Sequence, residues 1–139
     1  MPPGQILPAQ SLFDALGRLV MVWPLRGWSW DRRWSCAASS FSSDNQGEAR
    51  AAVVIAMPVQ WTDRTVKNAP PFVKQIADAT GGVRAEQVLY CSEPVAGLVA
   101  YGLWWPWGDE KNVSFRVGLA GSPGSKEQAK FAEVFKVEA

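Results

Sequence analysis

The chain contains no histidine. Histidine is the only side chain whose ordinary pKa lies between pH 5 and 8, and it is the commonest metal ligand. Its absence excludes a Ser-His-Asp triad, a Cys-His nucleophile and zinc sites built on imidazole. The two cysteines, Cys36 and Cys91, are too few for a four-sulfur zinc site. We therefore predict no metal and no cofactor, and a function that depends on binding rather than on catalysis.

The chain also lacks an excess of charge and a long apolar run. Fourteen basic residues face 13 acidic ones, with no block of either sign, so the sequence does not predict nucleic-acid binding. The apolar stretch at residues 12–23 is interrupted by Asp14 and Arg18 and is too short to cross a membrane. No signal peptide is recognisable, so we expect a cytoplasmic protein, with a mature secreted chain as the alternative.

The composition is that of one globular domain. Apolar residues make up 47% of the 139 positions and charged residues 19%, which is typical of a folded chain of this length. Residues 1–10 carry three prolines and a glycine and predict an irregular N-terminal arm. Residues 11–139 show no linker and no internal repeat, and are predicted to form a single α+β domain.

The spacing of apolar residues predicts alternating helices and strands. Helices are expected from Ser11 to about Val20, from the Pro70–Pro71 pair to the Gly81–Gly82 pair, and from Ser125, where Ser125 and Gln128 fit a capping box. Five strands are expected at residues 28–41, 51–59, 86–92, 97–107 and 112–120. The predicted fold class is α+β, a single five-stranded antiparallel sheet with helices packed on it, in the order α-β-β-α-β-β-β-α.

This predicted order, from about Ser11 to Ala139, resembles that of the profilin and roadblock/longin families of small regulatory platforms. The resemblance is one of element order, and it brings no motif and no functional residue to this sequence. Another α+β sandwich, such as that of secretion chaperones, is an alternative with a similar pattern.

Tryptophan is abundant, with eight residues concentrated in "WSWDRRW" (residues 28–34) and "YGLWWPW" (residues 101–107). If residues 28–41 form one strand, Trp28, Trp30, Arg32 and Trp34 share a face, and burial should increase from Trp30 toward Cys36. In the second segment, Tyr101, Leu103, Trp105 and Trp107 share a face, while Trp104 points the other way. These aromatic side chains either fill the core or form a contact surface, and we expect some of each.

A protein–protein contact is the function we predict, because tryptophan and arginine dominate the energetics of interfaces. The partner would be another protein or a second copy of the chain, with no nucleic acid and no membrane. The alternatives are a tryptophan-lined pocket for a small apolar or aromatic ligand, and an enzyme with Cys91 as nucleophile and Glu93 as base. The predicted contact residues are Trp28, Trp30, Arg32, Trp34, Trp104, Trp105 and Trp107.

Two further expectations concern the interior. Cys36 and Cys91 are predicted to be reduced and buried, although a disulfide or a redox switch would also fit a lone pair of thiols. Phe131 and Phe135, at i and i+4, should anchor the terminal helix on the sheet. In the last strand the core-facing residues should be Val113, Phe115, Val117 and Leu119.

Overall fold

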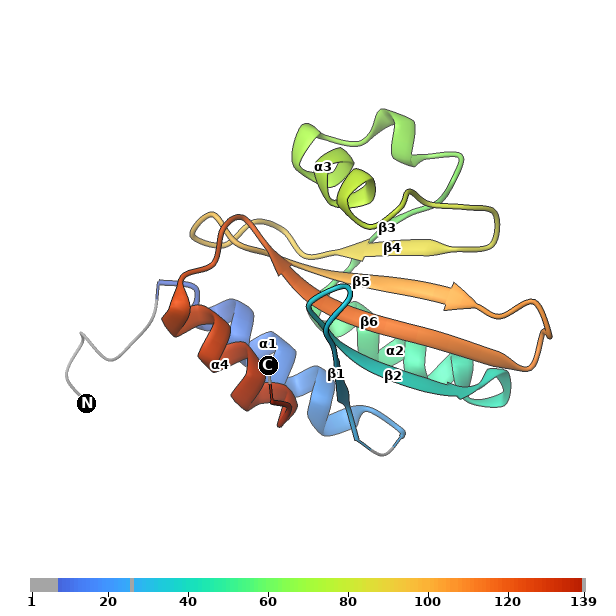
Figure 1. Ribbon diagram of the computed structural model, residues 1–139, viewed down its shortest axis with the longest axis horizontal. Coiled ribbons are helices and arrows are strands. Elements are labelled where there is room, and N and C mark those ends of the chain that lie inside the picture. The colour runs from blue at the N-terminus through green and yellow to red at the C-terminus, as the bar shows by residue number, and fades with distance from the viewer. Residues whose placement is uncertain (1–7, 26, 139) are drawn as a thin grey trace.

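A computed structural model describes residues 8–25 and 27–138, so most of the predicted N-terminal arm lies outside the described residues. Within them the chain forms one antiparallel sheet of six strands, in the order β1-β2-β6-β5-β4-β3 (Figure 1). The strands are β1 (Ser29–Asp31), β2 (Cys36–Ser42), β3 (Val59–Trp61), β4 (Val88–Cys91), β5 (Val99–Pro106) and β6 (Asn112–Ala120). The helices are α1 (Gln10–Val22), α2 (Gln46–Ala56), α3 (Pro71–Ala79) and α4 (Ser125–Phe135).

The two faces of the sheet are covered unequally. Helices α1, α2 and α4 pack on one side, which we call the helix-layer face, and α3 lies on the other side near β3 and β4, which we call the α3 face (Figure 1). Because successive side chains of a strand point to opposite sides, each strand contributes to both faces. The helix-layer face carries Ala37, Phe41, Tyr90, Trp104, Val113, Phe115 and Val117, and the α3 face carries Cys36, Leu89, Cys91, Val99, Tyr101, Leu103 and Trp105.

Strands β5 and β6 form the centre of the sheet, and each strand has a glycine that lies beneath an aromatic ring of the other. On the helix-layer face, a Cβ added at Gly102 would lie 2.6 Å from the ring of Phe115. On the α3 face, a Cβ added at Gly118 would overlap the phenol of Tyr101. Both rings therefore lie flat across the neighbouring strand, in space that any larger residue would occupy.

Residues 51–56 form the C-terminal half of helix α2 and not the predicted central strand, and Val59 is the first residue of β3. Ala49, Ala52, Val53 and Ala56 recur at helical spacing and are buried against the sheet. The opposite side of α2 is also apolar, with Val54 and Ile55 exposed. A helix that is apolar on both sides lacks the polar face from which helical periodicity is recognised, which is why the strand prediction was wrong.

Residues 28–41 do not form one strand, because a turn divides them into β1 and β2. The carboxylate of Asp31 accepts hydrogen bonds from the backbone N–H groups of Arg33 and Trp34, at 3.0 and 3.3 Å. Ser35 then takes a positive φ of 53°, and the chain reverses so that Asp31 pairs with Cys36. An aspartate whose side chain accepts a hydrogen bond from the backbone N–H two residues later is typical of a turn. Here this turn interrupts the single strand that the alternation of tryptophans predicted.

The remaining elements agree with the sequence. The predicted ranges agree with the observed elements α1, α3, α4, β4, β5 and β6. Phe131 and Phe135 lie on the buried side of α4, with ring centroids 4.8 Å apart. The capping box differs, because Glu127 accepts from the Gly124 N–H at 2.8 Å while Gln128 donates to the Pro123 carbonyl. The sheet has six strands and not the predicted five, because residues 28–41 form two strands, residues 51–56 belong to α2, and β3 was not predicted as a separate strand. The element order that resembled profilin and roadblock/longin proteins is therefore not the observed one.

Candidate functional site

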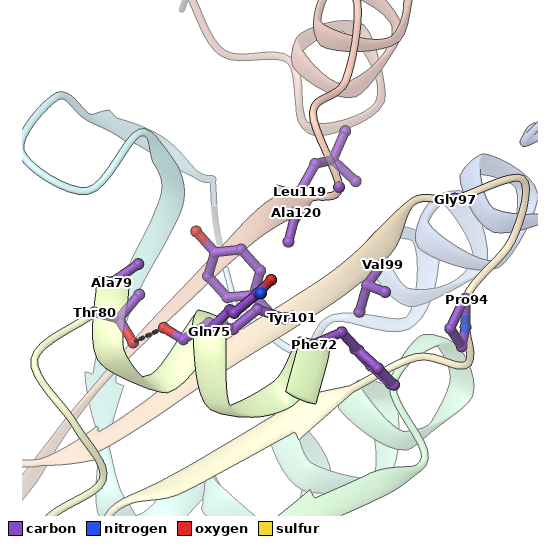
Figure 2. Close-up of a pocket in the computed structure, with 12 residues that line it drawn as sticks. Phe72, Gln75, Ala79, Thr80, Pro94, Gly97, Val99, Tyr101, Leu119 and Ala120 are labelled. Atoms are coloured by element: carbon purple, nitrogen blue, oxygen red, sulfur yellow. Dashed lines mark hydrogen bonds between the residues drawn. The ribbon is translucent and has the colours of Figure 1, made fainter. Parts of the chain in front are cut away.

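The α3 face contains an apolar cavity between α3 and the ends of β5 and β6 (Figure 2). Its volume is about 390 Å³. Helix α3 is positioned here by Val73, Ile76 and Ala77, which recur at spacings of three and four and are buried against the sheet. The lining is contributed by α3, by the β4–β5 connection and by the sheet, and includes Phe72, Ile76, Pro94, Val99, Tyr101 and Leu119.

One end of this cavity is bounded by a close approach of two backbone segments. Gly97, in the β4–β5 connection, and Gly121, after β6, both have positive φ values, 80° and 97°. A Cβ added at Gly121 would overlap the carbonyl oxygen of Gly97. This end of the cavity is therefore formed by main chain, and its shape depends on both residues being glycine.

A second hollow, of about 370 Å³, lies at the C-terminal end of α3. It is lined by Arg33 and Trp34 from the β1–β2 turn, by Trp105 from β5, and by the segment that follows α3. Thr80 lines both hollows, so the two are adjacent. We refer to the two adjacent hollows together as the groove along α3, with an apolar end and an end bordered by tryptophan and arginine.

The tryptophan end of the groove is held together by paired rings and guanidinium groups. The rings of Trp34 and Trp105 meet edge to face, with centroids 5.5 Å apart and an interplanar angle of 78°. The Arg33 guanidinium lies 5.2 Å from the Trp34 ring, and that of Arg116 lies 4.8 Å from the Trp105 ring. Each contact is a favourable cation–π geometry.

Arg116 is itself fixed by Asp31, whose Oδ2 lies 2.7 Å from the arginine Nε. Partial burial alone would raise the pKa of Asp31, but the hydrogen bonds from Arg116 and from the turn backbone outweigh it, so this pKa lies below its ordinary value. The same carboxylate thus closes the β1–β2 turn and neutralises Arg116. Among residues 8–25 and 27–138 no carboxylate forms an ion pair with Arg33, and the charged residues that line the second hollow are Arg33 and Arg84.

The cysteines lie on the α3 face and are poor nucleophiles. Burial raises the pKa of Cys36 to about 11 and that of Cys91 to about 12, so both are neutral thiols near pH 7. Cys36 Sγ lies 3.7 Å from the hydroxyl of Tyr101, whose pKa is also raised by burial. Glu93 lies exposed beyond the end of β4, outside the environment that encloses Cys91. Burial thus disfavours the Cys91 thiolate that the predicted Cys91–Glu93 pair would need.

Of the seven predicted contact residues, the structure brings Trp34 and Trp105 together in the groove. Trp107 lies just beyond β5 and is 49% exposed, with Nε1 donating to Ser114 Oγ at 2.8 Å. Arg32 is exposed in the β1–β2 turn and does not line either hollow.

The other three predicted residues belong to the helix-layer face. Trp104 is fully buried, and the Arg50 guanidinium lies 4.4 Å from its ring. Trp28 and Trp30 are half-buried, with the Trp28 ring 4.8 Å from that of Phe135. The expected gradual increase in burial from Trp30 to Cys36 is not formed, because Arg32 between them is exposed and the turn places Trp30 and Cys36 on opposite faces. A single platform of all seven side chains is therefore not formed.

Several groove residues were missed in the sequence. Arg33, Thr80 and Arg84 were not among the predicted contact residues. The available signal was Asp31, which is placed two residues before Arg33 and so predicts a turn that displays Arg33 and Trp34. No local pattern indicates that this turn lies beside the end of α3, where the Trp34 ring lies 3.8 Å from a Cβ built at Gly81.

No family model matches this chain, and no match was found among curated proteins or among solved structures. In residues 8–25 and 27–138, no helix is long and apolar enough to cross a membrane. The same part of the chain contains no group of three or more cysteine, aspartate or glutamate side chains placed to hold a metal ion.

Proposed function

We propose that this chain is a non-enzymatic binding domain that takes a small organic ligand into the groove along α3. The observation that carries the proposal is the junction of an apolar cavity with a hollow bordered by Trp34 and Trp105. Ligand sites are typically concave and mostly apolar, with a few polar groups that orient the ligand, and have volumes of about 300–1,000 Å³. The two hollows, of about 390 and 370 Å³, are in this range.

Physical argument favours a ligand over plain packing at this place. Trp34 and Trp105 stay partly exposed beside the hollows, so part of the free energy that full burial of their rings would provide is not gained. A planar or apolar ligand in the groove would bury these rings. The groove is also built from three separate chain segments, namely the β1–β2 turn, the end of α3 and strand β5, and a ligand would contact all three.

Ligand-observed NMR with a library of small organic compounds tests the proposal. Compounds that bind should lose affinity in Trp34→Ala and keep it in Trp30→Ala, which removes a half-buried tryptophan from the opposite face. A second pair of variants tests the cavity. Ala120→Leu adds bulk to its lining, whereas Ala38→Leu adds the same bulk to the α3 face outside both hollows. The proposal is contradicted if no compound binds, or if binding is equally sensitive to both members of each pair.

A protein contact through the α3 face is the second candidate. It is favoured by the part of this face that α3 leaves uncovered, where Trp107 and Ser40 are exposed. An exposed tryptophan beside polar residues is the composition of many interface centres. Sedimentation velocity over a range of concentrations would detect self-association, and Trp107→Ala should then weaken it while leaving ligand binding in the groove unchanged.

A further inference from the structure

The two ends of the groove differ in charge as well as in shape. The apolar end has no charged residue in its lining, and its polar side chains are Gln75, Thr80 and Tyr101. Thr80 donates its hydroxyl hydrogen bond to the Ile76 carbonyl at 2.8 Å, and the Tyr101 hydroxyl lies against Cys36. A charged group placed in this end would lose its hydration without gaining an ionic partner, which is costly.

The other end presents two guanidinium groups without a compensating carboxylate. Within the described residues the ion pairs are Asp31–Arg116 and Lys130–Glu133, and neither involves Arg33 or Arg84. The carboxylate nearest to Arg33 in sequence, Asp31, is already bound by Arg116. Glu86 follows Arg84 closely but is exposed and does not line the hollow.

The backbone beneath both arginines is fixed by local hydrogen bonds. Asp31 accepts from the N–H of Arg33 at 3.0 Å, and the Gln87 side-chain oxygen accepts from the N–H of Arg84 at 2.9 Å. Both arginine side chains therefore start from backbone that hydrogen bonds hold in place, and both line the same hollow. A ligand anion between them would satisfy donors that are otherwise left to solvent, because guanidinium groups bind carboxylate and phosphate oxygens in a bidentate manner.

We infer that the natural ligand is a monomeric amphipathic anion, with its apolar body in the cavity beside Val99 and Tyr101 and its carboxylate or phosphate between Arg33 and Arg84. This inference rests on the proposed function, because it names the chemical class of the ligand for the same groove. Thr80, which lines both hollows, marks the boundary between the apolar body and the charged head.

Three probes with the same ten-carbon chain and different head groups test the inference: decanoate, decanol and decylamine, each kept below its micelle concentration. Isothermal titration calorimetry should show decanoate binding at least about tenfold tighter than decanol, since a hydrogen-bonded charge contributes about 1.5–3 kcal/mol. Decylamine should bind more weakly than decanol. Raising the salt concentration should weaken decanoate binding and leave decanol binding unchanged.

The variants separate the head-group site from general charge effects. The double variant Arg33→Gln with Arg84→Gln should lower decanoate affinity about tenfold and leave decanol affinity unchanged. The control is Arg32→Gln with Arg64→Gln, which removes the same charge from two exposed arginines outside both hollows and should bind decanoate like the wild type. Circular dichroism spectra should coincide for the wild type and the two double variants.

The outcomes distinguish failure of the inference about the anionic head group from failure of the proposed ligand-binding function. Failure of all three probes to bind, together with a negative library screen, overturns both the proposed function and the inference. Equal affinity for decanoate and decanol, unaffected by Arg33→Gln with Arg84→Gln, overturns the inference and leaves a neutral-ligand site. Binding to vesicles of anionic phospholipid without binding of monomeric decanoate also overturns it, because the anion would then be a membrane surface.

Discussion

The two faces of the sheet are built from the same strands, but only one of them is sealed. On the helix-layer face three helices cover the sheet, and the rings of Trp104, Phe115 and Tyr90 are fully buried. On the α3 face a single helix of nine residues covers part of the sheet, and Trp34 and Trp105 stay half-buried beside two hollows. The groove that we propose as a binding site lies where the helical cover ends.

Trp104 and Trp105 show this difference between adjacent residues of one strand. Alternation along β5 directs Trp104 into the core and Trp105 into the groove. Arginine accompanies both rings, Arg50 over Trp104 and Arg116 over Trp105. The same residue type in the same strand therefore serves packing on one face and, in our proposal, ligand binding on the other.

Truncation of these two tryptophans should give the largest difference between the faces. Trp104→Ala should lower the free energy of unfolding by about 3–5 kcal/mol, because it empties a fully buried site. Trp105→Ala should cost less, about 1–2 kcal/mol, because part of its ring surface is already exposed. Urea unfolding followed by circular dichroism measures both. Equal losses would show that the α3 face is packed as a core and would remove the distinction.

A sharper variant of the same experiment is Trp104→Phe. The indole Nε1 of Trp104 is buried without a hydrogen-bond partner among the described residues, so replacement by phenylalanine removes an unsatisfied donor along with some volume. We expect Trp104→Phe to lose less than half of what Trp104→Ala loses.

The glycines beneath the two central rings provide the next comparison. Gly102→Ala must displace the fully buried Phe115 ring and should cost about 1–3 kcal/mol. Gly118→Ala displaces Tyr101, which borders the apolar cavity and has space to move, so its cost should be smaller and ligand affinity should fall instead. Thermal unfolding and calorimetry report the two effects. Gly17→Ala is the control, because a Cβ there meets nothing within 4 Å in the middle of α1, and it should stabilise slightly.

The rate at which the two cysteines react with a thiol reagent tests how well α3 shields the part of the sheet beneath it from solvent. With pKa values raised to about 11 and about 12, Cys36 and Cys91 should both react slowly with a thiol reagent at pH 8, and two thiols should appear in denaturant. They lie on β2 and β4 with two strands between them, about 14 Å apart at about 4.8 Å per strand, so they cannot form a disulfide in this fold. Rapid reaction of either thiol in the native protein would show that the α3 face opens readily.

The smallest effect is expected from the ion pair that supports the groove. Because the pKa of Asp31 is lowered in the folded chain, the pair contributes stability above the ordinary value of 3.8 and loses it as the pH falls through the lower folded value. Arg116→Gln should therefore lower stability by at most about 1 kcal/mol at pH 6 and by less at pH 2.5. Melting temperatures of the two proteins at both pH values check this. A difference that grows on acidification would contradict it.

The sequence predicted those parts of the fold that depend on local patterns. Strand β6 alternates so regularly that its core-facing residues, Val113, Phe115, Val117 and Leu119, follow directly from the sequence, and the Pro70–Pro71 and Gly81–Gly82 pairs bound α3. The prediction for α2 was wrong because Val54 and Ile55 give it an apolar outer side. Sequence patterns report the polarity of a segment, and here an exposed apolar surface looks like a buried one.

The candidate site was less predictable because it depends on contacts between distant segments. The abundance of tryptophan and arginine indicated the right residue types, and Trp34 and Trp105 were among those named. Their meeting depends on a turn set by Asp31 and on the position of α3, neither of which alternation encodes. Arg84 joins them from a segment about 50 residues away from Arg33, and local patterns carry no information about such a contact.

The reciprocal placement of Gly102 and Gly118 beneath aromatic rings also determines how β5 and β6 align. A shift of one residue between β5 and β6 would turn the buried side chains of one strand to the opposite face of the sheet. The loss of their burial strongly disfavours such a shift. A slip of two residues keeps the faces, but it would set Tyr101 opposite Arg116 or Ala120 in place of Gly118, and the ring would collide with a side chain. The two glycines thus exclude a two-residue shift of β5 along β6, which the pattern of apolar residues alone would allow. Strands β5 and β6 also carry Tyr101, Trp105 and Arg116. The register that the two glycines select therefore sets the relative positions of these groove residues during folding.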